Sequence, residues 1–314
     1  MRKIIITGAG GFIGRSLVSR LAKNKKNFII AIDNDQRGNL EKIENKKNII
    51  KKKIDILNRK KINNIIKGCH TCFHLAAING TKNFYNIPKE VLETGVQGTL
   101  NVINSVIKNK LNEFIFFSSS EAYQKPNLIP TKENEILKIP DVYNPRLSYG
   151  GSKIIGELLT INYLRNSGIN YKILRPHNVF GPDMGNDHVL PELLNKIKNK
   201  KNQKIIKLKI FGSGDESRSF IYIEDAVSAI LKIYKKGLKN SIYNVGSSKE
   251  IKIKNLVFLI SKILKKKIVI KKSSLHLGSV PRRCPDISKL KKIGHKNLYS
   301  LKQGLKKIIN YYFK

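Results

Sequence analysis

Short runs of β-branched and aromatic residues alternate with longer, mixed stretches through the first half of the chain. The short runs predict buried β-strands, and apolar residues at helical spacing in the longer stretches predict amphipathic helices. The predicted strands are Lys3–Thr7, Phe28–Asp33, Ile49–Asp55, Thr71–Leu75, Glu113–Ser118 and Asn170–Arg175. The predicted helices are Phe12–Lys23, Arg59–Lys67, Val91–Lys108 and Tyr149–Asn166. This order predicts an α/β fold in which helices cover a parallel sheet.

The alternation becomes irregular after Arg175, where prolines and glycines predict a loop. A helix is expected near 190–198 and a closing helix near 301–311. We expect a doubly wound parallel sheet with a smaller, interleaved C-terminal substrate-binding lobe. The expected nucleotide-binding domain spans 1–175 with a returning segment at about 206–245, and the expected lobe spans 176–205 and 246–314.

The composition is that of a globular chain without a membrane segment. Of the 314 residues, 40% are hydrophobic and 26% are charged, which is typical of a folded protein. No apolar run approaches the ~20 residues that cross a bilayer. The first apolar stretch also reaches glycine too soon for a secretory signal. We therefore expect a soluble, cytoplasmic protein with no membrane partner.

The net charge of +39 is the unusual feature of the composition. Lysine and arginine number 61 against 22 acidic residues, and 50 of the 61 are lysine. A nucleic-acid-binding surface would favour arginine on one face or between stacking aromatics, whereas these lysines are scattered among asparagine and isoleucine. Compositional bias therefore explains the charge better than specific nucleic-acid binding does. The field should still attract anionic ligands such as phosphates.

Two of the three cysteines, Cys69 and Cys72, have the C-x-x-C spacing of some metal and redox sites. The third is Cys284, and no second Cys or His pair completes a tetrahedral zinc site. The residues around the pair are typical of a strand edge. We expect buried free thiols and no metal.

The strongest local motif is a glycine array between the first predicted strand and the first predicted helix, Thr7-Gly8-Ala9-Gly10-Gly11-Phe12-Ile13-Gly14. Gly8, Gly11 and Gly14 allow a tight turn, close approach of a pyrophosphate and close packing of helix on strand. Asp33 ends the second strand, where a carboxylate accepts hydrogen bonds from an adenosine ribose. This Rossmann-type arrangement predicts a dinucleotide site. The carboxylate would repel a 2′-phosphate and favours NAD over NADP, although Arg37 lies nearby.

Tyr149 and Lys153 are four residues apart on a predicted helix and share one face. A phenol is a poor base at neutral pH, but a neighbouring ammonium and a cationic nicotinamide ring favour the phenolate. Tyr149 could then remove a hydroxyl proton while hydride leaves the same carbon. This spacing alone is common on solvated helices. The glycine array upstream makes the catalytic interpretation of the pair more specific.

A serine-rich segment follows the predicted strand Glu113–Ser118, at the sheet edge where open α/β folds bind ligands. Ser119 or Ser120 could hydrogen-bond the reacting oxygen, and Glu121 could act as a second acid or base. A serine-rich turn with a solvated glutamate is the alternative interpretation.

Taken together, the motifs resemble the extended short-chain dehydrogenase/reductase family, in its branch of nucleotide-sugar epimerases, dehydratases and decarboxylases. The resemblance rests on TGAGGFIG at 7–14, Asp33, Asp55-Ile56, HLAA at 74–77, SSSEAY at 118–123, YGGSK at 149–153 and RPHNVFGP at 175–182. It runs through essentially the whole chain in order, and it is more specific for the family than for the reaction.

The resemblance implies an NAD-dependent enzyme that oxidises the C4 hydroxyl of a nucleoside-diphosphate sugar and later returns the hydride. It implies that Tyr149 is the base, that Lys153 holds the nicotinamide ribose and lowers the pKa of the tyrosine, and that Ser119 hydrogen-bonds the C4 oxygen. It also implies a homodimer formed through the helix that carries Tyr149. Apolar surface for that interface is offered by Ile154, Ile155, Leu158, Leu159 and Ile161, although the same residues would serve an ordinary core.

The binding residues implied by the resemblance lie along the whole chain. Asp55 and Ile56 match the pair that meets the adenine, and Ala76 matches a turn beside the cofactor. Asn178 matches a residue that contacts the substrate phosphates or sugar, and Arg218 matches an arginine that binds the diphosphate. We expect a further carboxylate, that of Asp225, to cap a helix instead of binding a ligand.

The residues leave the reaction open between several outcomes of the C4 ketone. Related dehydratases resemble Thr-Asp-Glu at the positions of Ser119, Ser120 and Glu121. Ser120 stands in place of the aspartate, and because a serine is a far weaker acid, this difference counts against 4,6-dehydration. Decarboxylases of this branch are similar in carrying Ser-Glu, a Pro-Arg before the catalytic tyrosine and an arginine in an R-x-P-[DS]-I segment, matched here by Glu121, Arg146 and Arg283. Decarboxylation and C4 epimerisation therefore remain the favoured reactions. A non-catalytic module that binds NAD or nucleic acid is the alternative from another class.

Overall fold

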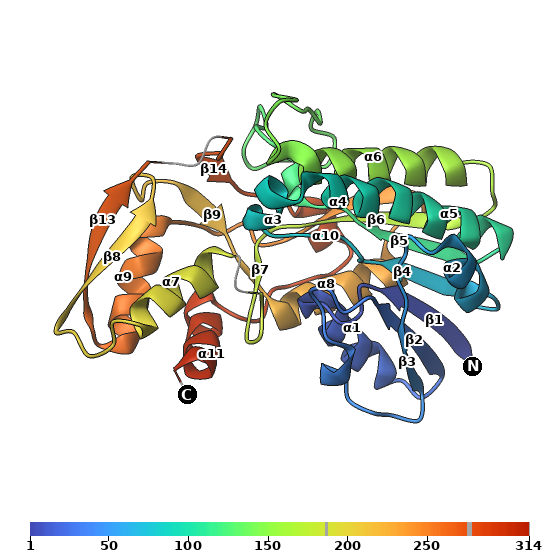
Figure 1. Cartoon of the computed structure of the whole chain (residues 1–314), viewed down its shortest axis with the longest axis horizontal. Helices are drawn as coiled ribbons and strands as arrows, with labels where there is room; N and C mark the ends of the chain where they lie inside the picture. The colour runs from blue at the N-terminus through green and yellow to red at the C-terminus, as the bar shows by residue number, and fades with distance from the viewer. Residues whose placement is uncertain (186–187, 275–277, 314) are drawn as a thin grey trace.

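A seven-stranded parallel sheet forms the larger part of the molecule (Figure 1). The computed structural model describes residues 1–185, 188–274 and 278–313. In spatial order the strands are β11 (Ser241–Val245), β6 (Asn170–Pro176), β5 (Glu113–Phe117), β4 (Thr71–His74), β1 (Arg2–Thr7), β2 (Asn27–Asp33) and β3 (Ile49–Lys53). The order reverses direction at β1, as in a doubly wound fold. The predicted fold class is confirmed.

Helices cover both faces of this sheet because its central strands alternate apolar side chains to either side. Ile4 and Ile6 pack on one face with α1 (Phe12–Ala22) and α8 (Ile223–Lys236). Ile5 packs on the other. The helices of that second face are α2 (Arg59–Ile66), α5 (Thr99–Lys108) and α6 (Leu147–Leu164).

The segment predicted as one α-helix, Val91–Lys108, is not a regular α-helix in its middle part. The segment comprises α4 (Pro88–Leu92), a π-helical turn η2 (Glu93–Gly98) and α5. The glycines of η2 allow close packing, because a Cβ on Gly95 would lie 2.6 Å from Ser152 Oγ on α6. A π turn inserts a residue without ending the helix, and helical spacing in the sequence does not reveal it.

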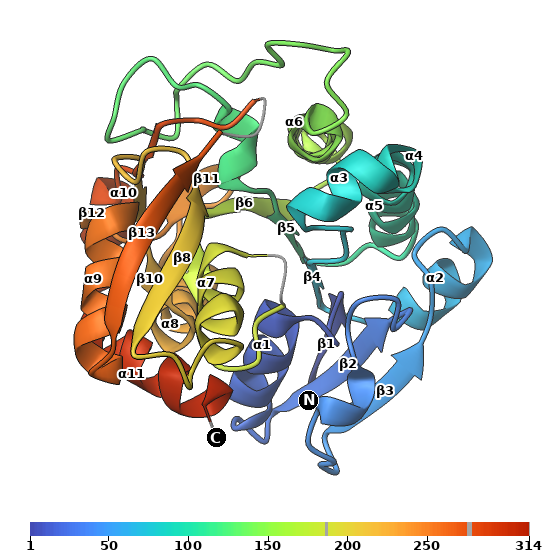
Figure 2. The ribbon, with the colours of Figure 1, turned by 60° about the vertical axis from the view of Figure 1, so that its left-hand side comes forward.

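The smaller lobe lies beyond the carboxyl ends of the strands (Figure 2). Its elements are α7 (Val189–Lys198), β8 (Ile205–Phe211), α9 (Ile253–Leu264), β13 (Lys267–Ser273) and α11 (Leu301–Tyr312). Two small sheets complete it, β12 (Glu250–Lys252) with β9 (Ser217–Ser219) and β14 (Arg282–Arg283), and β10 (Ile221–Tyr222) with β7 (Val179–Phe180).

The division of the chain into two domains stays a prediction. Within the segment 206–245, α8 and β11 lie with the large sheet. Strand β8 pairs instead with β13, in parallel. The remaining short elements are η1 (Leu40–Lys42), α3 (Thr81–Asn86), η3 (Ser120–Tyr123) and α10 (Ser288–Lys292), the last beside β11.

Asp225 joins two segments and does not cap its own helix. It lies in the first turn of α8, and its carboxylate accepts hydrogen bonds from the backbone N–H groups of Leu298 and Tyr299, both at 2.9 Å. The N-cap of α8 is Tyr222, which makes no side-chain capping bond. The expected cap was wrong because long-range contacts bring residues 298 and 299 to this carboxylate.

The three cysteines are free and buried. Burial raises the pKa of the Cys69 thiol to about 11, which disfavours the reactive thiolate. Among the described residues, no group of three or more His, Cys, Asp or Glu side chains could hold a metal ion. The same part of the chain has no helix that is both long and apolar enough to span a membrane.

Candidate active site

A cavity of about 1350 Å³ lies between the carboxyl ends of the parallel strands and the smaller lobe. This is the place where open α/β sheets bind ligands. Every predicted site residue except Asp55 lines it. The lining includes Gly8, Gly11, Phe12, Ile13, Gly14, Asp33, Ile56, Ala76, Ser119, Ser120, Glu121, Arg146, Tyr149, Lys153, Asn178, Arg218 and Arg283.

The turn between β1 and α1 is shaped to receive a phosphate. Gly8 has a φ of +69°, and a Cβ there would lie 2.7 Å from the backbone nitrogen of Ala76. A Cβ on Gly14 would lie 2.2 Å from the carbonyl oxygen of Gly8. Helix α1 has no side-chain cap and no acidic residue in its first turn, so its N-terminal N–H groups are directed to a ligand. These features fit a dinucleotide pyrophosphate.

Asp33 lies beside this turn at the end of β2. Its carboxylate accepts hydrogen bonds from Gly10 N and Asp35 N, both at 2.9 Å. Burial raises the pKa of this carboxyl, and the two backbone bonds oppose the rise. The carboxylate retains lone pairs for a ribose hydroxyl, and Arg37 lines the same cavity.

Asp55 does not line the cavity, contrary to its expected place at the adenine. One of its oxygens accepts a hydrogen bond from Asn34 Nδ2 at 2.9 Å, and the other accepts from Leu57 N at 2.8 Å. Asn34 and Ile56 reach the cavity instead. The carboxylate holds its own loop in this structure, and its place at the adenine stays a prediction.

Tyr149 and Lys153 lie together in the buried first half of α6. The Tyr149 ring stacks on Phe84 with centroids 4.9 Å apart. Lys153 Nζ donates to the carbonyl oxygen of Phe117 at 2.8 Å and lies 5.6 Å from the centre of the Tyr149 ring. Phe84 is on the short helix α3, which the sequence pattern did not predict.

The two pKa values in this pair differ from the expectation that Lys153 lowers the pKa of the tyrosine. Burial raises the pKa of Tyr149 to about 12, and a hydrogen bond with Ser119 opposes the rise. Burial also lowers the pKa of Lys153 to about 7, which the nearby Glu157 carboxylate partly offsets. Desolvation disfavours both charged forms, so in the protein alone the phenol is neutral at pH 7.

A buried ion pair supports the strand end that carries the serines. Glu157 follows Lys153 by one turn on α6 and pairs with Arg175 at 2.6 Å. Its other oxygen accepts a hydrogen bond from Ser118 Oγ at 2.5 Å. This contact orients the segment Ser118–Ser120 above the carboxyl end of β5.

Ser119 and Glu121 occupy a 3₁₀ turn directly after β5. Ser119 is the N-cap of η3, and its Oγ accepts a hydrogen bond from Glu121 N at 3.1 Å. The same serine lies near the Tyr149 phenol and lowers its pKa against the effect of burial. Ser120, which the sequence equally favoured, is buried at the cavity wall.

Glu121 lies between two arginines from distant parts of the chain. Arg283 Nη1 donates to Glu121 Oε1, and Arg146 Nη1 lies 3.6 Å from Glu121 Oε2. Burial alone would raise the pKa of Glu121, but the charges of Arg283 and Arg146 lower it to about 2. Glu121 is therefore ionised at neutral pH and could act as a base or as an electrostatic partner, but not as an acid.

The arginines have hydrogen-bonding capacity left over. Nε and Nη2 of Arg283 and Nε of Arg146 are buried and have no hydrogen-bond partner in the described part of the chain. Unsatisfied buried donors of this kind are costly. Because both side chains line the cavity, their donors are suited to an anionic or oxygen-rich ligand.

The remaining two predicted binding residues line the cavity but are held by backbone groups. Asn178 Nδ2 donates to the Ser219 carbonyl oxygen at 2.8 Å. Arg218 donates to the carbonyl oxygens of Ser217 and Val280, each at 2.7 Å. With a third bond to the Pro281 carbonyl oxygen at 3.2 Å, these contacts use three of the five N–H groups of the guanidinium, so Arg218 can still donate to a diphosphate.

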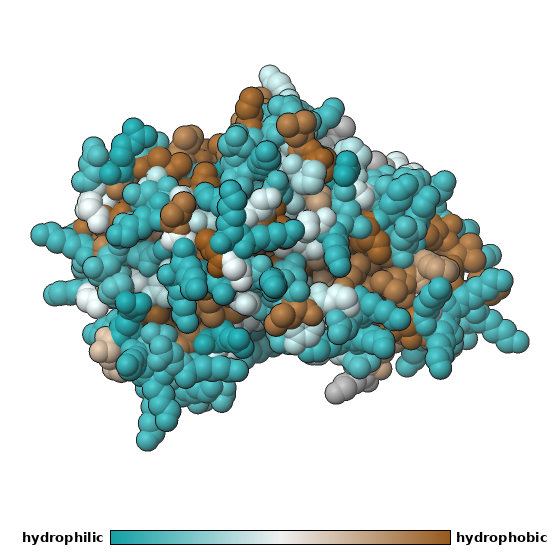
Figure 3. All heavy atoms as spheres, turned by 180° about the vertical axis from the view of Figure 1, so that it is seen from behind, coloured by the Kyte–Doolittle hydropathy of each residue, from teal (hydrophilic) through white to brown (hydrophobic). Residues whose placement is uncertain are grey.

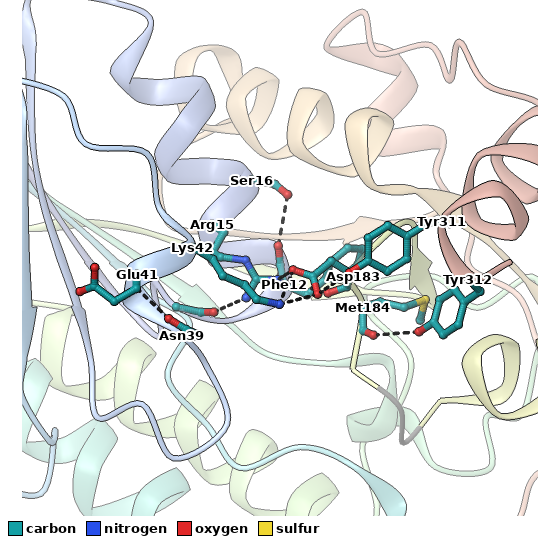
Figure 4. A network of polar contacts seen from close by, with 11 residues as sticks. Phe12, Arg15, Ser16, Asn39, Glu41, Lys42, Asp183, Met184, Tyr311 and Tyr312 are labelled. Carbon is teal, nitrogen blue, oxygen red and sulfur yellow. Dashed lines mark hydrogen bonds and ion pairs between the residues drawn. The ribbon is translucent and has the colours of Figure 1, made fainter. Parts of the chain in front are cut away.

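Sequence reasoning missed a polar network at the rim of the cavity (Figure 4). Asp183, in the loop after β7, contacts Arg15 of α1, Lys42 of η1 and Tyr311 of α11. The only sequence signal for this network was the position of Arg15 directly after the glycine array. Asp183 lies in a loop where no periodic pattern identifies partners.

Comparisons with known proteins identify the family of the chain. Residues 4–246 match the model of the NAD dependent epimerase/dehydratase family. A UDP-N-acetyl-alpha-D-glucosaminuronate decarboxylase of Bacillus cytotoxicus is 30% identical, over 99% of this chain and 98% of that protein.

Two solved structures have the same fold over nearly their whole length. The UDP-glucose 4-epimerase of Thermotoga maritima, solved with UDP-glucose, has a TM-score of 0.88 at 27% identity and covers 99% of this chain and 98% of its own. The UDP-glucuronic acid 4-epimerase of Bacillus cereus, solved with UDP-glucuronic acid and NAD, has the same TM-score, identity and coverage. The chain therefore belongs to the NAD dependent epimerase/dehydratase family and is an NAD-dependent enzyme.

Proposed function

We propose that the enzyme oxidises the C4 hydroxyl of a nucleoside-diphosphate hexuronic acid and then decarboxylates the 4-ketone. The observation that carries this proposal is the pairing of Glu121 with Arg283 and Arg146, with three arginine nitrogens still unsatisfied. Two arginines around one carboxylate leave a net positive charge, which suits a second carboxylate on the sugar.

In the first step of this proposal, Tyr149 and Ser119 act on the C4 hydroxyl. Bound NAD would accept a hydride from the sugar C4 and return it at the end of the cycle. Tyr149 Oη takes the proton of the C4 hydroxyl, and Ser119 Oγ, which lies near the same phenol, holds the reacting oxygen. The phenolate form needs a nearby positive charge, which the Lys153 ammonium supplies when protonated.

Decarboxylation then follows from the position of the ketone. The C4 ketone is β to the C5 carboxylate, so the electron pair of the breaking carbon–carbon bond moves to the C4 oxygen as carbon dioxide leaves. Tyr149, now protonated, donates a hydrogen bond to that developing enolate. The enolate then takes up a proton from water at C5, which regenerates the C4 ketone that accepts the returning hydride. Arg283 would hold the departing carboxylate, and the ionised Glu121 orients Arg283.

Epimerisation at C4 is the second candidate, and a specific observation favours it. It needs only that the ketone accept hydride on its other face, and relatives with this fold include a UDP-glucuronic acid 4-epimerase. Both candidates use the same C4 oxidation and a hexuronic acid. A 4,6-dehydration is less favoured because Ser120 stands at the position of a dehydratase acid.

Mass spectrometry after incubation with NAD and UDP-glucuronate separates these reactions. Loss of carbon dioxide supports decarboxylation, and an isomer of unchanged mass supports epimerisation. Tyr149→Phe should lower the rate by about 10²–10⁴-fold, whereas Tyr143→Phe, 93% exposed on a loop, should leave it unchanged. Absence of turnover with hexuronic acids but turnover of neutral sugars would contradict the role given to the arginines.

We also propose that the enzyme is a homodimer through the outer face of α6. Leu158 and Tyr163 are 55% and 45% exposed there, and Leu92 of α4 is 41% exposed. The inner face of α6 is instead lined by small and polar residues. An apolar outer face of this kind suits an isologous interface between two copies. The cytoplasmic location stays a prediction.

A further inference from the structure

Three separate elements meet at the carboxylate of Asp183 (Figure 4). Lys42 Nζ of η1 donates to both oxygens, at 2.7 and 3.0 Å. Arg15 Nη2 of α1 donates to Oδ2 at 2.7 Å, and Tyr311 OH of α11 donates to Oδ1 at 3.2 Å. We call the group Arg15, Lys42, Asp183 and Tyr311 the Asp183 clasp.

The clasp joins the two sides of the cavity at its rim. Asp183 and Tyr311 belong to the side of the smaller lobe, and Arg15 and Lys42 belong to the side of the large sheet. All four line the cavity. The Asp183 and Lys42 side chains are 35% and 49% exposed, so this bridge lies where the cavity opens to solvent.

The clasp is also tied to the floor of the dinucleotide site. Arg15 Nη1 donates to the carbonyl oxygen of Gly10 in the glycine turn at 2.5 Å. Gly10 N in turn donates to the Asp33 carboxylate at 2.9 Å. A continuous chain of hydrogen bonds therefore runs from Asp33, the residue predicted to bind the ribose, to Asp183 on the lobe side of the cavity.

The geometry of Asp183 is set by its backbone as well as by its partners. Its φ is +58°, in the left-handed region that aspartate tolerates better than most residues. Arg15 Nη2 donates to the Asp183 carbonyl oxygen at 3.1 Å in addition to its carboxylate. Burial raises the pKa of the carboxyl, but Lys42 and Arg15 outweigh it and hold the pKa below its usual value.

A single exposed ion pair contributes little, but this carboxylate has two cationic partners and a phenol. Residues that would hold the cofactor, from Asp33 and the glycine turn to Tyr149, line the cavity that the clasp bridges. A dinucleotide in this cavity would have the clasp at its exit. We propose that the Asp183 clasp closes the cavity over bound NAD and limits the rate at which the cofactor leaves.

The inference rests on NAD dependence and not on the identity of the sugar. Retention matters here because the enzyme returns the hydride to its own substrate, so the reduced cofactor must stay bound between the two transfers. A clasp of ion pairs would hold it through the cycle, while still permitting exchange when the pairs open.

The test is the rate at which labelled NAD bound to the full-length protein exchanges with excess unlabelled NAD, without any sugar present. Asp183→Asn keeps the side-chain size and removes the charge, and it should raise the exchange rate by about three- to tenfold. High salt should accelerate exchange in the parent and should affect Asp183→Asn much less, because salt screens exposed ion pairs.

Glu224→Gln is the matched control. Glu224 also joins α11 to another element through a lysine and a tyrosine, Lys307 and Tyr299, but it does not line the cavity. The rate of NAD exchange in Glu224→Gln should stay within about twofold of the parent rate. Equal acceleration in Glu224→Gln, or no acceleration in Asp183→Asn, would overturn the proposal.

Lys42→Met provides a second variant should Asp183→Asn fail to fold, since Lys42 is half exposed. It should accelerate exchange by a smaller factor than Asp183→Asn, because Arg15 still binds the carboxylate. An unchanged exchange rate in Lys42→Met would count against the clasp. Sugar turnover is measured in a separate assay. Failure of the clasp proposal, seen in the NAD exchange rates, can therefore be distinguished from failure of the proposed sugar reaction, seen in turnover.

Discussion

At the scale of single residues, the site is built from charges that burial makes costly. Lys153 lies in the core with its pKa lowered to about 7 by desolvation. Glu121 has its pKa lowered to about 2 because the charges of Arg283 and Arg146 outweigh its burial. The two groups differ because only Glu121 has oppositely charged partners at hydrogen-bond or ion-pair distance.

Lys153 should make the stability of the protein depend on pH. Its folded-state pKa is below the usual 10.5, so between about pH 7 and 10 the unfolded chain binds more protons than the folded chain. The free energy of unfolding should therefore rise with pH across this window. The rise attributable to Lys153 should be on the order of 3 kcal/mol.

Denaturant unfolding of Lys153→Met at several pH values measures this effect. The parent should gain stability relative to the variant as the pH rises, while Lys302→Met, on the exposed side of α11, should follow the parent. A constant difference between parent and Lys153→Met across the window would contradict the lowered pKa.

Arg283 should discriminate acidic from neutral sugars. Arg283→Gln removes one of the two cations at Glu121, so KM for a nucleoside-diphosphate hexuronic acid should rise by about 10- to 100-fold. The KM for a neutral nucleoside-diphosphate hexose should change much less. Steady-state kinetics with both sugars measure the difference.

Arg282→Gln is the control for this prediction. Arg282 is the neighbouring residue, 51% exposed, and it pairs with Glu250. It should leave both KM values near those of the parent. If Arg283→Gln raises the two KM values equally, the arginine binds a part that both substrates share, such as the diphosphate.

At the scale of elements, α6 determines how close the catalytic pair lies to the sheet. Its inner face carries Gly156 against Phe116 of β5, and a Cβ at that position would lie 2.3 Å from Phe116 Cζ. Phe116 is fully buried and has no free space to move into. The glycine thus allows the helix to approach the strand.

Gly156→Ala should lower the free energy of unfolding by about 1–3 kcal/mol, the usual cost of overpacking a core. It should also lower kcat, because Tyr149 and Lys153 are on the same helix. Gly151→Ala on α6 is the matched control, since its Cβ would meet only the end of Ile139, at 3.2 Å. There the better helix propensity of alanine should keep stability at or above that of the parent. Thermal melts and turnover of both variants measure the contrast, and equal loss in both would contradict the packing argument.

At the scale of the whole molecule, the surface is dominated by hydrophilic side chains. Figure 3 shows one face on which they project around most of the outline, with hydrophobic residues in scattered patches between them. The net charge of +39 should attract nucleotide sugars through the summed field. The apolar outer face of α6 is the exception, and it is the surface through which we propose that two copies associate.

Leu158→Lys should shift the protein from dimer to monomer. Leu158 is 55% exposed on α6, and a lysine there would place two like charges in an isologous interface. Sedimentation at micromolar concentration measures the change. Leu238→Lys, at a residue 66% exposed beyond α8, is the control and should remain a dimer. A parent that sediments as a monomer would contradict the proposed interface.

Most of the fold and part of the site could be predicted from local patterns. The six predicted strands of the first half and the glycine turn follow from residue type and spacing within short windows, which is also why their ends differ by only one or two residues. The π turn at Glu93–Gly98 and helix α3 could not be predicted, because they depend on packing against α6 and Tyr149.

The sequence by itself determined the alternation of the main strands and helices up to Arg175, the glycine turn with Asp33, and the placement of Tyr149 and Lys153 on one helix face. These are local properties, in which side-chain chemistry and periodicity act over a few residues. Only the tertiary structure decided that Arg283 meets Glu121 across 162 positions, that Asp183 joins Arg15 to Lys42, and that Asp55 stays outside the cavity. It also decided the direction of the Tyr149 and Lys153 pKa shifts, because desolvation depends on which distant segments cover a group.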